Sequence, residues 1–241
     1  MNIDLSSSPA KCNTCILGKQ TRTPVPKVRE GERASCPFER VFVDLCGPMQ
    51  PVSSSSNLYS MNVVDDFSNY MWSLPLISKG DTASELQKWH RTIENQSGLK
   101  LKVLVTDNGE LMSKSISNWC SQFRILHYQT APYTSVQNGH AECMHRTLLD
   151  KAHVMRLSCN TPAFLWDEFC ATSAYLTNLT PSSSLQNRTP FKLWFSKRPS
   201  LNHLHEIGCR AFSLIQTSNP KVFACSRPCI LIGYAPQSKA Y

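Results

Sequence analysis

Three acidic residues stand at the edges of short predicted elements. Asp44 lies in a β-type run, Asp107 directly follows an apolar run, and Glu142 lies in the first turn of a helical stretch. A hard cation such as Mg²⁺ takes oxygen ligands and binds a protein through a few carboxylates, which leaves room for water and phosphate oxygens. Two such ions about 3.5–4 Å apart stabilise the attacking and leaving oxygens of a phosphoryl transfer. The pattern therefore predicts a metal-dependent phosphoryl-transfer site.

Each of these acids also has a purely structural interpretation. Asp44 suits the turn that follows it, Asp107 belongs to an Asp-Asn-Gly turn signal, and Glu142 is favoured by the helix dipole. Asp65 and Asp66 compete as ligands, but adjacent strand residues point to opposite faces, so at most one of them can join a cluster. The metal-site interpretation requires the first three acids to converge in space.

The elements that would position these acids are short and alternate in type. Apolar periodicity predicts strands at Arg40–Leu45, Leu58–Asp65, Tyr70–Ile77, Leu101–Val105 and Ile125–Tyr128, and helices at Gly80–Gln96, Ser113–Phe123 and from near Gly139 onward. The first three strands are joined by tight turns and predict an antiparallel meander. The whole order predicts an α/β fold, with a mixed sheet flanked by helices.

The helix expected from near Gly139 is amphipathic. Its apolar stripe is predicted to be Ala141, Met144, Leu148, Ala152 and Met155. Glu142, Arg146 and His153 share the neighbouring face. Further along, helices are predicted from Thr161-Pro162 to about Leu179 and after Thr189, and strands at Arg210–Ile215 and Cys229–Gly233.

Length and charge divide the chain into three expected regions. With 241 residues and 41% apolar content, one substantial core is expected at 38–200, between a tail at 1–37 and a small basic β-rich extension at 201–241. Residues 188–241 carry eight Lys or Arg and one acid, whereas residues 41–187 carry ten against twelve. An acidic centre within a basic frame suits a polyanion. A simple solubility bias is the alternative.

Compartment signals are few. No run approaches the length of a membrane span, and the start of the chain lacks the basic-then-apolar order of a secretory signal, so we expect an intracellular protein without membrane contact. The eleven cysteines are scattered without a framework spacing, which favours buried free thiols over disulfides.

A series of short motifs, in order and spacing from Cys12 to the end of the chain, carries a family resemblance. The motifs are Asp44-Leu-Cys-Gly-Pro, Asp65-Asp66-Phe-Ser, Thr106-Asp107-Asn-Gly, Pro132-Tyr133, Gln137-Asn138-Gly139-His-Ala-Glu142, Asn178 before a proline, Thr189-Pro190-Phe-Lys-Leu-Trp194 and Ile232-Gly233-Tyr234. Together they resemble the integrase of copia-type LTR retrotransposons, part of a Pol polyprotein. The resemblance implies an RNase H-like fold and an enzyme, a polynucleotidyl transferase of the retroviral integrase-like superfamily.

The resemblance also implies roles for single residues. Asp44, Asp107 and Glu142 would be the catalytic Asp-Asp-Glu ligands of Mg²⁺ or Mn²⁺, which serve 3′-end processing and then strand transfer. The partners implied are DNA, as element ends and target, and further copies of the chain, in the nucleus and cytoplasm.

Four further residues match the loop and helix that contact DNA in the family: Tyr133, Gln137, Asn138 and Arg146. Tyr133 either stacks on a base or closes its loop, whereas Arg146 is expected to contact phosphate.

Several positions depart from the family pattern. The His pair that completes a zinc site upstream of Cys12 and Cys15 is absent, so this remnant of a zinc finger is not expected to bind zinc. One Gly is missing after Asp107, Phe42 replaces a usual His, and Cys143 replaces a usual Arg. These departures indicate a drifting copy, and we expect the chain to be a truncated one. The alternative is therefore a catalytically inert, domesticated or pseudogene remnant that binds nucleic acid without turnover. A nuclease acting on RNA–DNA hybrids would share the metal site but lacks family support.

Overall fold

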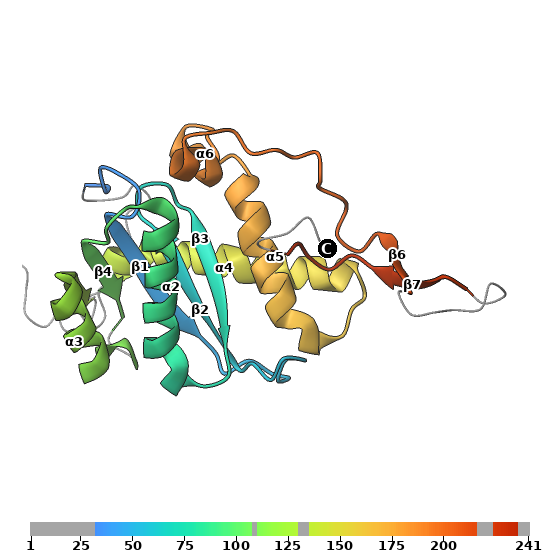
Figure 1. Cartoon of the computed structure of the whole chain (residues 1–241), viewed down its shortest axis with the longest axis horizontal. Helices are drawn as coiled ribbons and strands as arrows, with labels where there is room; N and C mark the ends of the chain where they lie inside the picture. Colours follow the sequence, from blue (N-terminus) through green and yellow to red (C-terminus); the bar gives the residue numbers. More distant parts are fainter. Residues whose placement is uncertain (1–31, 108–109, 130–134, 216–223, 236–241) are drawn as a thin grey trace, which may run out of the picture. The chain divides into compact units, whose positions relative to one another are not determined.

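The computed structural model describes residues 32–107, 110–129, 135–215 and 224–235, with residues 110 and 135–142 described by their backbone alone (Figure 1). All of these residues belong to one compact unit, Gly31–Tyr241. The predicted positions Cys12, Cys15 and Tyr133 lie outside the described residues. No helix among the described residues is long and apolar enough to cross a bilayer.

A five-stranded mixed sheet forms the centre of this unit. Its strands are β1 (Arg40–Cys46), β2 (Tyr59–Asp65), β3 (Met71–Leu76), β4 (Val103–Thr106) and β5 (Leu126–Gln129), in the spatial order β3-β2-β1-β4-β5. β1, β2 and β3 are antiparallel neighbours, while β4 and β5 run parallel to β1. The predicted meander and mixed sheet are confirmed. The five residues 66–70 between β2 and β3 are too few for a parallel crossover, whereas β1 and β2 are joined by a longer connection, 47–58, than the predicted tight turn. The helical crossovers through α2 (Thr82–Ser97) and α3 (Lys114–Phe123) return the chain in the parallel sense.

One face of the sheet packs against α2 (Thr82–Ser97) and α3 (Lys114–Phe123). Leu86, Trp89 and Ile93 of α2 are buried, as helical spacing predicts for one stripe. Gly98 ends this helix in the left-handed conformation with φ 69°, which glycine adopts without strain. Ser113 caps α3 by accepting a hydrogen bond from the Ile116 backbone N–H.

The opposite face packs against α4 (Ser135–Ser158) and α5 (Trp166–Leu179). Leu148 and Ala152 of the predicted apolar stripe are buried, and Met144 and Met155 pack beside them. The predicted start of this helix near Gly139 was wrong, because the backbone is helical from Ser135. A glycine inside a helix lowers stability by only about 1 kcal/mol, which the packing of a long amphipathic helix offsets.

Smaller elements follow α5 along the chain. These are α6 (Pro190–Phe195), capped by Thr189 as predicted, and the antiparallel pair β6 (Arg210–Leu214) and β7 (Ser226–Ile230). Short 3₁₀ turns occupy Lys79–Asp81, Glu110–Met112, Ala163–Leu165 and Ser183–Leu185.

The last strand was predicted three residues too late, at Cys229–Gly233. Pro228 lies inside β7, where a two-stranded sheet leaves one edge without ladder bonds, so a residue that cannot donate is tolerated. The segment after β7 leaves the strand and returns to α5, where Thr172 Oγ1 donates to the Ile232 carbonyl over 3.0 Å.

The competing acids Asp65 and Asp66 have structural roles. Asp65 Oδ1 accepts from the Phe38 N–H and Asp66 Oδ2 accepts from the Ala34 N–H, each at 2.8 Å. Both side chains are buried, and they fasten the segment before β1 to the turn after β2.

The nine cysteines within the described residues are all free thiols, as expected. The prediction that these thiols are buried was only partly right. Cys120 and Cys170 are buried, whereas Cys36, Cys143, Cys225 and Cys229 are exposed.

Candidate active site

Two of the predicted acids lie side by side at the end of the sheet. β1 and β4 are parallel neighbours with Val43 opposite Thr106, so the next residues, Asp44 and Asp107, follow at the same edge. Burial raises the pKa of Asp44 above its usual value, and the charge of Asp107 raises it further. The charge of Asp107 therefore acts on the Asp44 carboxyl group. The strand pairing therefore brings together residues that are far apart in sequence.

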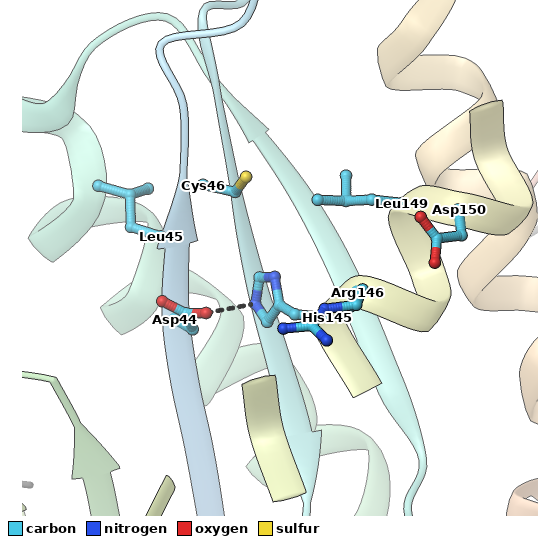
Figure 2. A pocket seen from close by; sticks show the side chains of 7 residues that line it. All are labelled: Asp44, Leu45, Cys46, His145, Arg146, Leu149 and Asp150. Carbon is cyan, nitrogen blue, oxygen red and sulfur yellow. Dashed lines mark ion pairs between the residues drawn. The ribbon is translucent and has the colours of Figure 1, made fainter. Parts of the chain in front are cut away.

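Helix α4 brings a buried histidine to the same edge. His145 Nε2 lies 3.4 Å from Asp44 Oδ2, within ion-pair distance but without forming a hydrogen bond (Figure 2). On the other side of the ring, Nδ1 lies 3.0 Å from Asn62 Nδ2. Burial lowers the pKa of His145, while the negative charge of Asp44 acts in the opposite direction. The neutral imidazole is therefore favoured.

An open pocket of about 370 Å³ adjoins these groups (Figure 2). It is lined by Asp44, Leu45, Cys46, His145, Arg146, Leu149 and Asp150. A water molecule occupies about 30 Å³ in the liquid, so the pocket has room for a hydrated cation together with a phosphate group. Arg146, exposed on α4, supplies a guanidinium beside the carboxylates. Acidic and basic groups thus face one small space.

The third predicted acid, Glu142, has its backbone in α4, and its side chain lies outside the described part of the structure. Position 142 is three residues before His145, and residues three apart share one face of a helix. Gln137 and Asn138 also lie in α4 with only their backbone described.

Two polar residues of the site were missed at the sequence level, His145 and Asn62. The helical count grouped Glu142 with Arg146 and His153, yet His153 is exposed and His145 is buried at 5% exposure. The spacing of three from Glu142 was an available signal for His145. Asn62 carried only the strand register as a signal, since it lies opposite Asp44 on β2.

The donor set fits a hard cation. Two carboxylates at adjacent strand ends repel one another, and a divalent ion converts that repulsion into attraction. Among the described side chains, no three His, Cys, Asp or Glu residues gather as a complete metal site. A third ligand would therefore have to come from a position such as 142, from substrate or from water.

Part of the chain matches a known protein family. Residues 34–135 match the family model described as integrase core domain, a segment that holds all five strands of the sheet together with Asp44 and Asp107. This segment belongs to the integrase core domain family. The family consists of polynucleotidyl transferase enzymes, so the predicted integrase class is confirmed.

Longer relatives of this integrase segment are retrotransposon polyproteins. The chain is 36% identical over 232 residues to the retrovirus-related Pol polyprotein from transposon TNT 1-94 of Nicotiana tabacum. It is 26% identical over 234 residues to that from transposon RE1 of Arabidopsis thaliana. Each alignment covers 95% of this chain but only 17% and 16% of the polyproteins, so the chain spans about a sixth of their length.

Solved structures agree on the fold. The HTLV-2 integrase catalytic core domain in complex with magnesium, in a trimeric form, has a TM-score of 0.52 at 16% identity, and the match covers 67% of this chain and 99% of that chain. An intasome of simian T-cell lymphotropic virus, in complex with the PP2A regulatory subunit B56 gamma, has a TM-score of 0.59 at 16% identity and covers 91% and 77%. The predicted RNase H-like architecture of an integrase core is confirmed.

Proposed function

We propose that this chain is the integrase region of a copia-type retrotransposon polyprotein, and that it processes the 3′ ends of element DNA and joins them to target DNA. The observation that carries this proposal is the meeting of Asp44 and Asp107 at adjacent parallel strand ends within an integrase core segment. The order of copia-type motifs along the sequence supports the finer assignment.

Asp44 and Asp107, with Glu142 from α4, would bind Mg²⁺ or Mn²⁺. The bound cations would neutralise the charge that develops on the phosphate during an in-line displacement. Asp44 is suited to this role because it is largely withdrawn from water and next to a second carboxylate, so a cation is a better partner for it than solvent. This chemistry needs positioning and electrostatic stabilisation rather than a covalent intermediate.

Arg146 would hold a phosphate oxygen at the pocket rim, and Tyr133, Gln137 and Asn138 would contact DNA near the cut. The position of Arg146 beside Asp44 in the pocket supports the first role. The net charge of +8 and the basic flanks support contact with element ends and target DNA. Assembly into homo-oligomers, in the nucleus and cytoplasm, completes the proposal. The trimeric form in which the HTLV-2 core domain was solved is in line with such assembly.

A strand-transfer assay tests the proposal. Purified protein is incubated with a 3′-hydroxyl oligonucleotide and plasmid DNA, in Mg²⁺ or Mn²⁺, and joined product is quantified. Asp107→Asn and Glu142→Gln should abolish joining. Glu168→Gln, on the exposed surface of α5, is the matched control and should join as wild type does. Equal joining by wild type and Glu142→Gln would refute the Asp-Asp-Glu assignment.

The same assay addresses the inert-remnant alternative. Salt-sensitive DNA binding by wild type, without joined product in either metal, would favour a remnant that binds without turnover. The changes at Phe42 and Cys143 motivate that alternative, whereas the preserved meeting of Asp44 and Asp107 argues against it.

A further inference from the structure

A chain of buried polar side chains leads across the sheet to Asp44. Ser73 Oγ lies 3.1 Å from Ser60 Oγ, and the Ser60 hydroxyl donates to Asn62 Oδ1 over 3.1 Å. Asn62 Nδ2 then lies 3.0 Å from His145 Nδ1, and the far side of the imidazole faces Asp44. Ser60, Asn62 and His145 are at most 5% exposed. Buried polar groups are costly when they are unpaired, and among these side chains His145 Nε2 is the atom without a hydrogen bond.

Strand register explains how the chain of contacts forms. Asp44 lies opposite Asn62 in the β1–β2 pair, and Asn62 lies opposite Ser73 in the β2–β3 pair. Directly opposed residues project from the same face of a sheet. The face on which they project packs against α4, and His145 of that helix contacts Asn62. Figure 2 shows the same imidazole beside Asp44.

The donor and acceptor roles in these contacts are consistent along the whole chain of side chains. The ring nitrogen that faces Asp44 is Nε2, which lies 3.4 Å from Oδ2 without forming a hydrogen bond, so the tautomer has to be read from the contact on the other side of the ring. A neutral imidazole protonated at Nε2 has a lone pair at Nδ1, which requires a donor. Asn62 Nδ2 is that donor, because the Ser60 hydroxyl already occupies Asn62 Oδ1. The tautomer of His145 is therefore set by Asn62.

We propose that His145, held by Asn62, is a positioning residue that orients the Asp44 carboxylate for cation binding. The inference rests on the proposed function, since it assigns Asp44 to a metal ion. The Nε2–H group attracts Oδ2 and leaves the other carboxylate oxygen to the cation. It also keeps the imidazole itself from becoming a ligand through Nε2. Groups that orient metal ligands in this way typically contribute about 10–100-fold to metal affinity.

Mn²⁺ affinity, measured by the electron paramagnetic resonance signal of the free ion, tests this role apart from turnover. His145→Leu and Asn62→Leu should each weaken Mn²⁺ binding by about 10–100-fold. His145→Gln should retain more affinity than His145→Leu, because its amide can place an N–H near the position of Nε2. His153→Leu is the matched control on an exposed face of the same helix, and should bind as wild type does.

A measurement on the wild-type protein avoids the problem of variants that fail to fold. In protein labelled with ¹⁵N-histidine, the His145 signals should report a proton on Nε2 and a lone pair on Nδ1. The signals are assigned by their absence from His145→Gln. A proton on Nδ1 would overturn the inference, because Asn62 could then not set the ring as described.

The outcomes separate this inference from the proposed function. If Asp44→Asn and Asp107→Asn bind Mn²⁺ as tightly as wild type, the metal site itself is wrong. If those variants lose Mn²⁺ while folded His145→Leu and Asn62→Leu keep it, the metal site stands and only the positioning role of His145 is refuted. Near-ultraviolet circular dichroism establishes that each variant is folded before its affinity is compared.

Discussion

Replacing Asn178 should destabilise the fold strongly, because its side chain satisfies the open edge of the sheet. β3 is an edge strand, so its outer backbone groups have no ladder partner. Asn178 on α5 accepts from the Met71 N–H over 2.9 Å and donates to the Met71 carbonyl over 2.8 Å. Its amide thus takes the place of the missing strand at that point.

The expected loss of stability follows from the two backbone groups of Met71 that would lose their hydrogen-bond partner. Asn178→Leu keeps a side chain of similar size but leaves one buried N–H and one buried carbonyl of Met71 unpaired. Each such group costs about 1–3 kcal/mol, so the free energy of unfolding should fall by about 2–6 kcal/mol. A domain of ordinary stability has about 5–15 kcal/mol in total.

Urea unfolding followed by tryptophan fluorescence measures this loss. The midpoint should fall while the slope stays constant, since the surface exposed on unfolding is unchanged. Asn118→Leu, at an exposed position of α3, makes the same substitution in a helix and should change stability by less than about 0.5 kcal/mol. An Asn178→Leu variant as stable as that control would refute the reasoning.

Three further predictions concern the strand ends, the buried acids and the pocket. Gly47→Ala should lower the free energy of unfolding by at least about 1–3 kcal/mol in the same assay, since φ is +134° and an added Cβ would lie 2.7 Å from the Leu58 carbonyl oxygen. Burial raises the pKa of Asp65 to about 6, from 3.8, so its contribution is fully present below about pH 3.8 and is lost as pH rises through 6. That loss, about 3 kcal/mol, should be absent from unfolding curves of Asp65→Asn, and an unchanged pH profile would contradict it. Arg146→Gln should make the salt dependence of duplex binding shallower by about 0.9 in log–log slope, and an equal slope would remove Arg146 from the phosphate contacts.

Most of the sheet and its helices could be predicted from local patterns. The strands from Arg40 and Leu58 and the helix that Gly98 ends were placed within a few residues, because apolar periodicity and turn residues act over short distances along the chain. The errors arose where packing outweighed local preference. The helix that begins at Ser135 continues through Gly139, and β7 includes Pro228 at a free edge.

The candidate site, too, could be predicted only in part from the sequence. Asp44 and Asp107 could be predicted as candidate ligands because Asp44 lies in one recognisable strand, Asp107 directly follows another, and each sits in a motif of the family. Their proximity follows from parallel pairing of β1 with β4. The environment of Asp44 could not be predicted, since burial and the approach of His145 depend on how α4 lies across the sheet.

The sequence by itself determined most helices and strands, the acidic residues and the integrase family. Helices and strands depend mainly on neighbouring residues, and the family is recognised from the order of motifs along the chain. Only the tertiary structure decided which polar groups meet around Asp44. The contact between Asn62 and His145 joins residues 83 positions apart, on a strand and a helix that no local pattern relates. Such contacts are selected by the burial of the apolar stripe of α4, which fixes the rotation of the helix and thereby the residues that it turns toward the sheet.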